Sequence, residues 1–148
     1  MAKGRALAAI ALLGMVCVGC GASGPAFKPV VIGESEAAIY IYRPGSGYVG
    51  SGVMLSIECD KRKIGTLKTN GYVVAVVPPG RHAISCATET KSEVPFQAES
   101  GKSYYIEAEV QMGLFIGRPK LTMVPREQGE LAILGTKYSG NKPYETHK

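Results

Sequence analysis

The chain has few of the side chains that carry acid–base chemistry in enzymes. Its 148 residues include one aspartate, Asp60, two histidines, His82 and His147, and no tryptophan. A Ser-His-Asp triad would have to combine His82 with Asp60. However, His82 follows a turn and begins a predicted strand, where we expect it to hydrogen-bond to the backbone. His147 lies one residue from the C-terminus. We therefore predict no catalytic residue and a protein that is not an enzyme.

Metal ligands also lack the usual spacing. By residue type, Cys59, Cys86 and His82 could form a zinc ligand set, but these three residues do not form a CxxC or HxxxH pair. His82 and Cys86 stand four residues apart on one predicted strand, a span of about 13 Å. Glu107 and Glu109 would share a strand face about 7 Å apart, which we interpret as the wet face of a sheet rather than an acid–base pair. We predict no metal and no cofactor.

Positive charge is present but not concentrated. The formal net charge is +5, and no basic run is longer than Lys61-Arg62-Lys63. Because a nucleic-acid interface needs a basic stripe or patch, we predict that no nucleic acid is a partner. The short basic run is more simply explained as a solvated turn.

The first 19 residues are typical of a secretory signal. Lys3 and Arg5 form a basic start, and residues 6–18 are 13 apolar or small residues in a row. That run is shorter than the roughly 20 residues needed to span a bilayer, and it has the length of a signal-peptide core. An uncleaved anchor or a buried helix is the less favoured alternative.

The residues around Cys20 resemble a bacterial lipoprotein signal, in which a small residue precedes an acceptor cysteine. Gly19 and Val18 fit the two positions before Cys20, whereas Cys17 departs from the usual leucine. We predict that residues 1–19 are a lipoprotein signal peptide and that Cys20 is lipidated. Cleavage after Ala22 and acylation of Cys17 are the alternatives.

This resemblance implies a location. Two or three acyl chains, at about 0.8 kcal/mol per buried methylene, would attach the chain firmly to a membrane. Gly21, and not aspartate, follows Cys20, which implies the outer membrane of the bacterial cell envelope, with the protein facing the periplasm. Residues 20–36 would then form a lipidated, flexible tether.

Two cysteines remain after the signal and the acceptor are set aside. Cys59 and Cys86 both fall on the apolar face of a predicted strand. An oxidising envelope compartment favours pairing them, and a disulfide closing this loop would add roughly 3–4 kcal/mol by the chain-entropy model. We predict this disulfide; two buried free thiols are the alternative.

From residue 37 onward, short β-type runs alternate with turn signals. The expected strands cover residues 37–43, 53–59, 63–67, 72–77, 82–88, 94–98, 104–111 and 121–124. The turns between them include a tight turn at residues 60–62 and the hairpin signal Asn70-Gly71. This pattern predicts an all-β protein, a single antiparallel β-sandwich, immunoglobulin-like, with about seven or eight short strands over residues 37–134. The hairpin with Asp60 and Gly65, followed by Pro79, Gly80 and His82, also resembles PEGA-type sandwich modules.

The end of the chain is less regular. Residues 127–134 predict a short C-terminal helix with Leu131 and Leu134 facing inward, and residues 135–148 predict a flexible tail. Among the tyrosines, Tyr40, Tyr42 and Tyr105 fall opposite the aliphatic residues of their strands. Exposed, they would form a platform for a glycan or a protein; the favoured alternative is that they close the rim of the core.

A glycine-rich stretch follows the first strand and matches the spelling of a nucleotide-binding loop. A phosphate-binding loop needs a helix after it, because the helix N-terminus faces the phosphate. Here the β-type run VMLSIEC follows instead, so we predict no nucleotide partner. We interpret the stretch as a candidate contact loop formed by Arg43, Gly45, Gly47, Tyr48, Gly50 and Gly52.

Several pieces of the sequence occur together in a recognisable order. They are AAIYIYRP, the glycine-rich stretch, IECDKRKIGTL, NGYVVAVVPPGRH, SGKSYYIEAEV and the spaced Gly117, Pro119 and Leu121. Over residues 37–124 this order resembles the bacterial family catalogued as domain of unknown function 2846, many members of which carry lipoprotein signals. The resemblance implies a β-sandwich in the cell envelope and brings no catalytic residues with it.

These observations favour a non-catalytic, lipid-anchored envelope protein that acts as an interaction or structural module, whose sheet or loops contact another envelope component, an envelope protein or peptidoglycan. A module that binds peptidoglycan or another glycan is the alternative. An envelope enzyme is the least favoured of the three, because so few acid–base groups are available.

Overall fold

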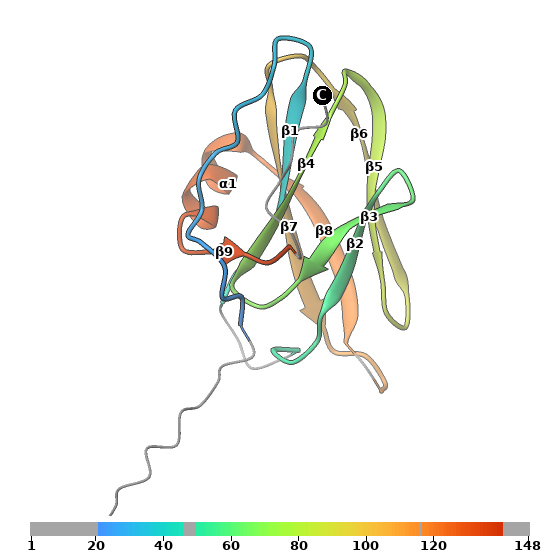
Figure 1. Ribbon diagram of the computed structural model, residues 1–148. Coiled ribbons are helices and arrows are strands. Elements are labelled where there is room, and N and C mark those ends of the chain that lie inside the picture. Colours follow the sequence, from blue (N-terminus) through green and yellow to red (C-terminus); the bar gives the residue numbers. More distant parts are fainter. Residues whose placement is uncertain (1–20, 46–49, 116, 141–148) are drawn as a thin grey trace, which may run out of the picture.

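The computed structural model describes residues 21–45, 50–115 and 117–140. They form two β-sheets packed against each other and one short helix (Figure 1), which confirms the predicted all-β sandwich with a C-terminal helix. The elements are β1 (Ala37–Arg43), β2 (Leu55–Cys59), β3 (Arg62–Leu67), β4 (Gly71–Val77), β5 (Gly80–Ala87), β6 (Lys91–Ala98), β7 (Ser103–Gln111), β8 (Arg118–Val124), α1 (Arg126–Ile133) and β9 (Lys137–Tyr138).

The first sheet has the strand order β8-β7-β1-β4-β9, and the second has the order β3-β2-β5-β6. Most neighbours are antiparallel, as predicted, but β1 pairs with β7 in parallel, and β4 pairs with β9 in parallel. The first sheet is therefore mixed. The parallel pairs arise because both β7 and β9 reach this sheet through long connections, and not through tight hairpins.

The main core lies between the two sheets and follows the period of two that the sequence shows. Leu55, Ile57 and Cys59 of β2 are buried while the residues between them are half-buried. Ile39 and Ile41 of β1 meet them from the opposite sheet in the same cluster. Alternation of this kind is what a sheet with one core face requires.

The outer face of the first sheet is also buried, which the sequence pattern does not predict. Every residue of β1 is buried, including Tyr40 and Tyr42 at 1% and 0% exposure. Tyr105 of β7, expected on a wet face, is 4% exposed. The exposed tyrosine platform is therefore wrong: these rings form a second core with Tyr72 and Ile133.

The N-terminal segment supplies much of the cover over this second core. The ring of Phe27 packs edge-on against Tyr40 and Tyr72 at centroid distances of 5.3 and 5.2 Å. The amide of Val30 donates to the Tyr40 hydroxyl at 2.9 Å. Residues 21–36, predicted as a flexible tether, thus lie along the sheet as part of the fold (Figure 1).

The C-terminal segment covers the rest of the same face. In α1, Ile133 is buried, whereas Leu131 and Leu134 are 73% and 63% exposed, so the predicted inward direction of these two leucines is wrong. The helix turns Gly129 toward the sheet, where a Cβ atom would lie only 2.2 Å from the Cβ of Tyr105. The lack of a side chain at this position lets the helix approach the sheet closely.

The fold continues past residue 134, where the sequence predicts the start of a tail. Thr136 and Ser139 are buried, and β9 adds to the edge of the first sheet beside β4. Ser139 also ties the two sheets together, because its amide donates to Tyr72 and its hydroxyl donates to Thr66. Residues 141–148 of the predicted tail lie outside the described residues.

Two turns differ in their role. Asp60 and Lys61 have φ values of 50° and 66°, and they close the tight hairpin between β2 and β3 as predicted. Asn70 also has a positive φ, 55°, but Asn70-Gly71 connects β3 to β4, which belong to different sheets. The predicted hairpin at this position is therefore a crossing between the two layers.

Among the described residues, no helix has the length and apolar character needed to cross a bilayer.

The cover provided by the N-terminal segment can be tested with Phe27→Ala. This change removes a half-buried ring and two aromatic contacts, so we expect a loss of about 2 kcal/mol in the free energy of unfolding. Urea unfolding measures this loss. Val31→Ala is the matched control, because Val31 is 88% exposed in the same segment and its truncation should change stability by less than about 0.5 kcal/mol. Equal effects of both variants would contradict the docked segment.

Candidate functional site

The glycine-rich stretch is fixed at both ends by contacts within the fold. Arg43 is buried, and its guanidinium donates to the backbone oxygens of Val53 and Gly50, both at 2.5 Å. Burial lowers the pKa of Arg43 below its ordinary value. Gly50 has a φ of 72°, and a Cβ atom there would meet the side chain of Val110 at 2.5 Å. Arg43 and Gly50 thus have a structural role in shaping this connection.

Of the other residues of the predicted contact loop, the structure describes Gly45 and Gly52. Gly45 lies beside the side chain of Asn70, and Gly52 faces open space. Gly47 and Tyr48 lie outside the described residues. The stretch leads into β2, a strand, as the sequence predicts.

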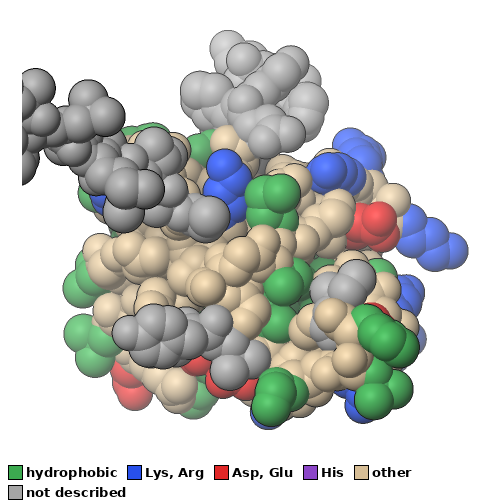
Figure 2. Space-filling model, turned by 90° about the horizontal axis from the view of Figure 1, so that it is seen from below, with side chains coloured by type: hydrophobic (Ala, Val, Ile, Leu, Met, Phe, Trp, Pro, Cys, Tyr) green, Lys and Arg blue, Asp and Glu red, His purple; other side chains and the backbone are tan. Residues whose placement is uncertain are grey.

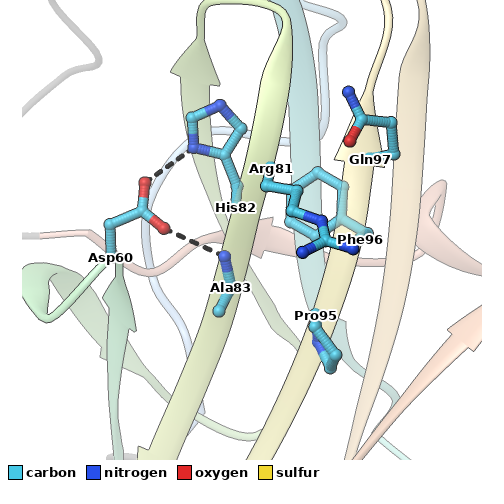
Figure 3. Close-up of a pocket in the computed structure, with 7 residues that line it drawn as sticks. All are labelled: Asp60, Arg81, His82, Ala83, Pro95, Phe96 and Gln97. Atoms are coloured by element: carbon cyan, nitrogen blue, oxygen red, sulfur yellow. Dashed lines mark hydrogen bonds and ion pairs between the residues drawn. The ribbon is translucent and has the colours of Figure 1, made fainter.

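Asp60 and His82 come together at the opposite end of β2. Asp60 occupies the β2–β3 turn and His82 lies near the start of β5, because β2 and β5 pair with Cys59 opposite Ile84. His82 Nδ1 lies 2.7 Å from Asp60 Oδ2, and the amide of Ala83 donates to Asp60 Oδ1 at 2.9 Å (Figure 3). One carboxylate therefore ties the turn to the neighbouring strand.

The second nitrogen of His82 is also engaged. Nε2 lies 2.8 Å from the backbone oxygen of Pro78 in the turn that precedes β5. Because a carboxylate and a carbonyl oxygen can only accept, the ring donates to both when each nitrogen carries a proton. This confirms the expected backbone hydrogen bond of His82. A Ser-His-Asp triad would require one ring nitrogen of His82 to face a serine hydroxyl. Here both nitrogens have other partners.

The environment of Asp60 has opposing effects on its pKa. Partial burial alone would raise the pKa, but the hydrogen bonds from His82 and the Ala83 amide outweigh it and hold the pKa of Asp60 below its ordinary value. The same carboxylate lies 3.9 Å from the thiol of Cys59. Burial, followed by the negative charge of Asp60, raises the pKa of Cys59 to about 11.

Cys59, Asp60 and His82 place one potential metal-ligand atom each within 4.8 Å of the others. The ligand set expected from the sequence contains Cys86 in place of Asp60, because only the tight turn after β2 brings the carboxylate back beside the thiol. Asp60 and His82 already satisfy each other, and in the described part of the chain no buried side-chain nitrogen or oxygen lacks a hydrogen-bond partner. The group is therefore complete as a hydrogen-bonded cluster without an ion.

A hollow opens beside this cluster on the surface of the second sheet. It has a volume of about 650 Å³ and is lined by Asp60, Arg81, His82, Ala83, Pro95, Phe96 and Gln97. Figure 3 shows these side chains arising from the turn after β2 and from β5 and β6. Arg81 and Gln97 are exposed and polar, while the ring of Phe96 packs against Tyr104 at 5.5 Å. The lining of the hollow thus combines apolar side chains with hydrogen-bonding groups.

The two remaining cysteines point into the core, as predicted, but both are free thiols in the structure. The strand register explains the absence of the predicted disulfide: Cys86 lies opposite Ile57, and Cys59 lies opposite Ile84. The two cysteines are therefore diagonal neighbours, and such pairs have Cα atoms about 7–8 Å apart, beyond the usual reach of a disulfide. Burial also raises the pKa of Cys86 to about 11.

Taken together, the fold and the cluster define a small two-sheet β-sandwich whose only histidine among the described residues has a structural role. The chain belongs to the family described as "Protein of unknown function (DUF2846)", whose model matches residues 33–118. This match confirms the resemblance found in the sequence.

A relative in Haemophilus influenzae, described as an uncharacterized protein, is 29% identical over 101 residues. The match covers 68% of this chain and 59% of the relative, so the chain spans less than two thirds of the relative's length. No solved structure matches the chain.

The link between Asp60 and His82 predicts a dependence of stability on pH. A carboxyl whose pKa is lower in the folded chain than in the unfolded chain stabilises the fold above its unfolded pKa, about 3.9. This contribution is lost as the pH falls through the folded pKa. At pH 7 we expect Asp60→Asn to lower the free energy of unfolding by only about 0.5–1 kcal/mol, because the half-exposed carboxylate is screened by solvent.

Urea unfolding at pH 7 and pH 3 measures this effect. The difference in the free energy of unfolding between the native chain and Asp60→Asn should be smaller at pH 3 than at pH 7, since the carboxyl is then becoming protonated. Asparagine suits the left-handed backbone at this position, so the turn is retained. Glu109→Gln, which removes a distant exposed ion pair with Lys120, is the control. A difference that grows on acidification would contradict the role of the carboxylate.

Proposed function

We propose that this protein is a non-catalytic, lipid-anchored domain of the bacterial cell envelope that binds another envelope protein. The lipid is attached at Cys20, and the partner contacts the hollow beside His82. The family membership gives no activity, so this proposal is supported by the arrangement of the two ends of the sandwich.

The observation that best supports this proposal is that the start of the N-terminal segment and the hollow lie at opposite ends of β2. Ala22 donates to Thr69, whose hydroxyl in turn donates to Ser51, shortly before β2 begins. Asp60, at the margin of the hollow, follows directly after β2 ends. A lipid on Cys20 would therefore lie at one end of the sandwich, with the hollow directed away from the membrane surface toward a partner.

The chemistry of the hollow supports binding in preference to catalysis. The ring nitrogens of His82 are engaged by Asp60 and Pro78. The raised pKa of Cys59 keeps its buried thiol protonated at neutral pH and therefore weakly nucleophilic. Arg81 and Gln97 instead offer exposed donors and acceptors around an apolar surface, which is the composition of a protein interface.

The predicted tyrosine platform now supports neither a glycan nor a protein partner, because these tyrosines are buried. A glycan would now have to bind in the hollow itself. Peptidoglycan is therefore used as a competing ligand in the test of the partner below.

The lipid anchor is tested by metabolic labelling with a clickable palmitate analogue. The native chain should be labelled, and Cys20→Ala should lose the label, because the thioether and the acylated amine both depend on this residue. Cys17→Ala is the matched control and should keep the label. Labelling that persists in Cys20→Ala, or that is lost only in Cys17→Ala, would contradict the predicted acceptor.

The contact surface is tested by a photo-crosslinking amino acid placed at Gln97, which is exposed at the margin of the hollow. In growing cells we expect crosslinks to a specific envelope protein. The same amino acid at Thr122, exposed on β8 in the other sheet, should give none. Identical products from both positions, or retention of the native chain on purified peptidoglycan that Gln97→Ala abolishes, would contradict a protein partner at this surface.

A further inference from the structure

The connection between β7 and β8 carries an unusual group of exposed apolar side chains. Met112, Leu114 and Phe115 are 81%, 80% and 95% exposed. They are three of four consecutive residues, and we refer to them as the apolar tip. Single exposed hydrophobic residues are common on soluble proteins. A contiguous group in one loop is instead typical of a surface that contacts a membrane or another protein.

The backbone of the apolar tip is held in place by the neighbouring β5–β6 turn. The carboxylate of Glu89 accepts from the amides of Phe115, at 2.7 Å, and Leu114, at 3.3 Å. Thr88 Oγ1 donates to the backbone oxygen of Gly117 at 2.6 Å. These hydrogen bonds satisfy backbone groups of the loop, while the apolar side chains of the tip remain exposed to solvent.

The apolar tip lies at the same end of the sandwich as the N-terminal segment. Ala22 pairs with Thr69, and Thr69 bonds to Ser51. Next to Ser51, Gly50 packs against Val110 near the end of β7, the strand that leads into the tip. In Figure 1 this end is the lower one, where the described chain begins.

Other side chains at this end have matching character. Met54, which precedes β2 in the neighbouring connection, is 60% exposed. Arg118, at the start of β8, is exposed and pairs in register with Gln111. Figure 2 views this end of the molecule and shows hydrophobic side chains with Lys and Arg side chains among them and along the edge, where some Asp and Glu side chains also lie. Apolar and aromatic groups combined with cations suit the boundary between phospholipid headgroups and acyl chains.

We propose that the apolar tip inserts into the membrane surface beside the lipid on Cys20, with Arg118 near the phosphate groups. This inference rests on the proposed lipid anchor, which brings the same end of the sandwich to the membrane. The two attachments together fix the orientation of the domain. The hollow beside His82 then faces away from the bilayer, and not along it.

The absence of tryptophan from the chain allows a direct test. Phe115→Trp introduces a single fluorophore into the apolar tip. Leu131→Trp places the same fluorophore at an exposed leucine of α1 and is the matched control. The full-length lipidated variants are reconstituted into phosphatidylethanolamine–phosphatidylglycerol vesicles, with and without brominated acyl chains. Flotation of the vesicles and tryptophan fluorescence are measured on the same samples.

We expect both variants to float with the vesicles. Phe115→Trp should show a blue-shifted emission that brominated lipid quenches, while Leu131→Trp should show neither effect. A double change, Met112→Ser with Leu114→Ser, should reduce the quenching in Phe115→Trp without affecting flotation.

The possible failures are distinct. Flotation without quenching of Phe115→Trp would overturn the inserted tip and leave the anchor standing. Failure of both variants to float would overturn the anchor and the inference with it. A blue shift that brominated lipid does not quench, and that grows with protein concentration, would show that a second copy covers the tip, and would also overturn the inference.

Discussion

Burial of β1 on both faces is the constraint on which the rest of the structure depends. Its aliphatic residues, Ile39 and Ile41, face the second sheet, while Tyr40 and Tyr42 face the other way and are equally inaccessible. Each large side chain removed from water contributes about 1.5–3 kcal/mol, so a first sheet covered on one side only would forfeit much of its stability. A third layer is therefore needed, and residues 21–36 and α1 provide it, while β9 extends the edge of the first sheet.

That third layer connects the fold to the proposed function. Since Phe27 and Val30 hold the N-terminal segment on the sheet, an anchor at Cys20 would be followed almost at once by ordered structure and not by a long free tether. A short link of this kind limits how the sandwich can tilt on a membrane. Under the proposed anchor, the fold itself would determine which end faces the membrane, with the apolar tip at that end and the hollow beside His82 at the other.

Much of the second sheet could be predicted from the sequence, because it has one core face and one solvent face. The alternation in LSIEC and the tight turn at Asp60 have local causes. The first sheet was harder: in AAIYIYR the tyrosines have the same period as polar outward residues, and only the packing of distant segments shows that they are buried. The Asn70-Gly71 turn shows the same limit, since local turn chemistry does not determine which sheet the next strand joins. For the candidate site, the sequence identified Asp60 and His82 as the residues that a Ser-His-Asp triad would have to use. Their bond, and the offset of Cys59 from Cys86, depend on the β2–β5 register, which no local pattern specifies.

The central claim is that the N-terminal segment is a structural layer of the sandwich, and amide hydrogen exchange tests it most directly. The amides of Ala22, Gly24 and Phe27 donate to backbone oxygens of Thr69, Tyr138 and Thr136. The account predicts that these amides exchange much more slowly than those of an unstructured peptide, with protection that approaches that of β4 and β9, on which they rest. Exchange of residues 21–30 at the rate of a free peptide, while β1 remains protected, would contradict it.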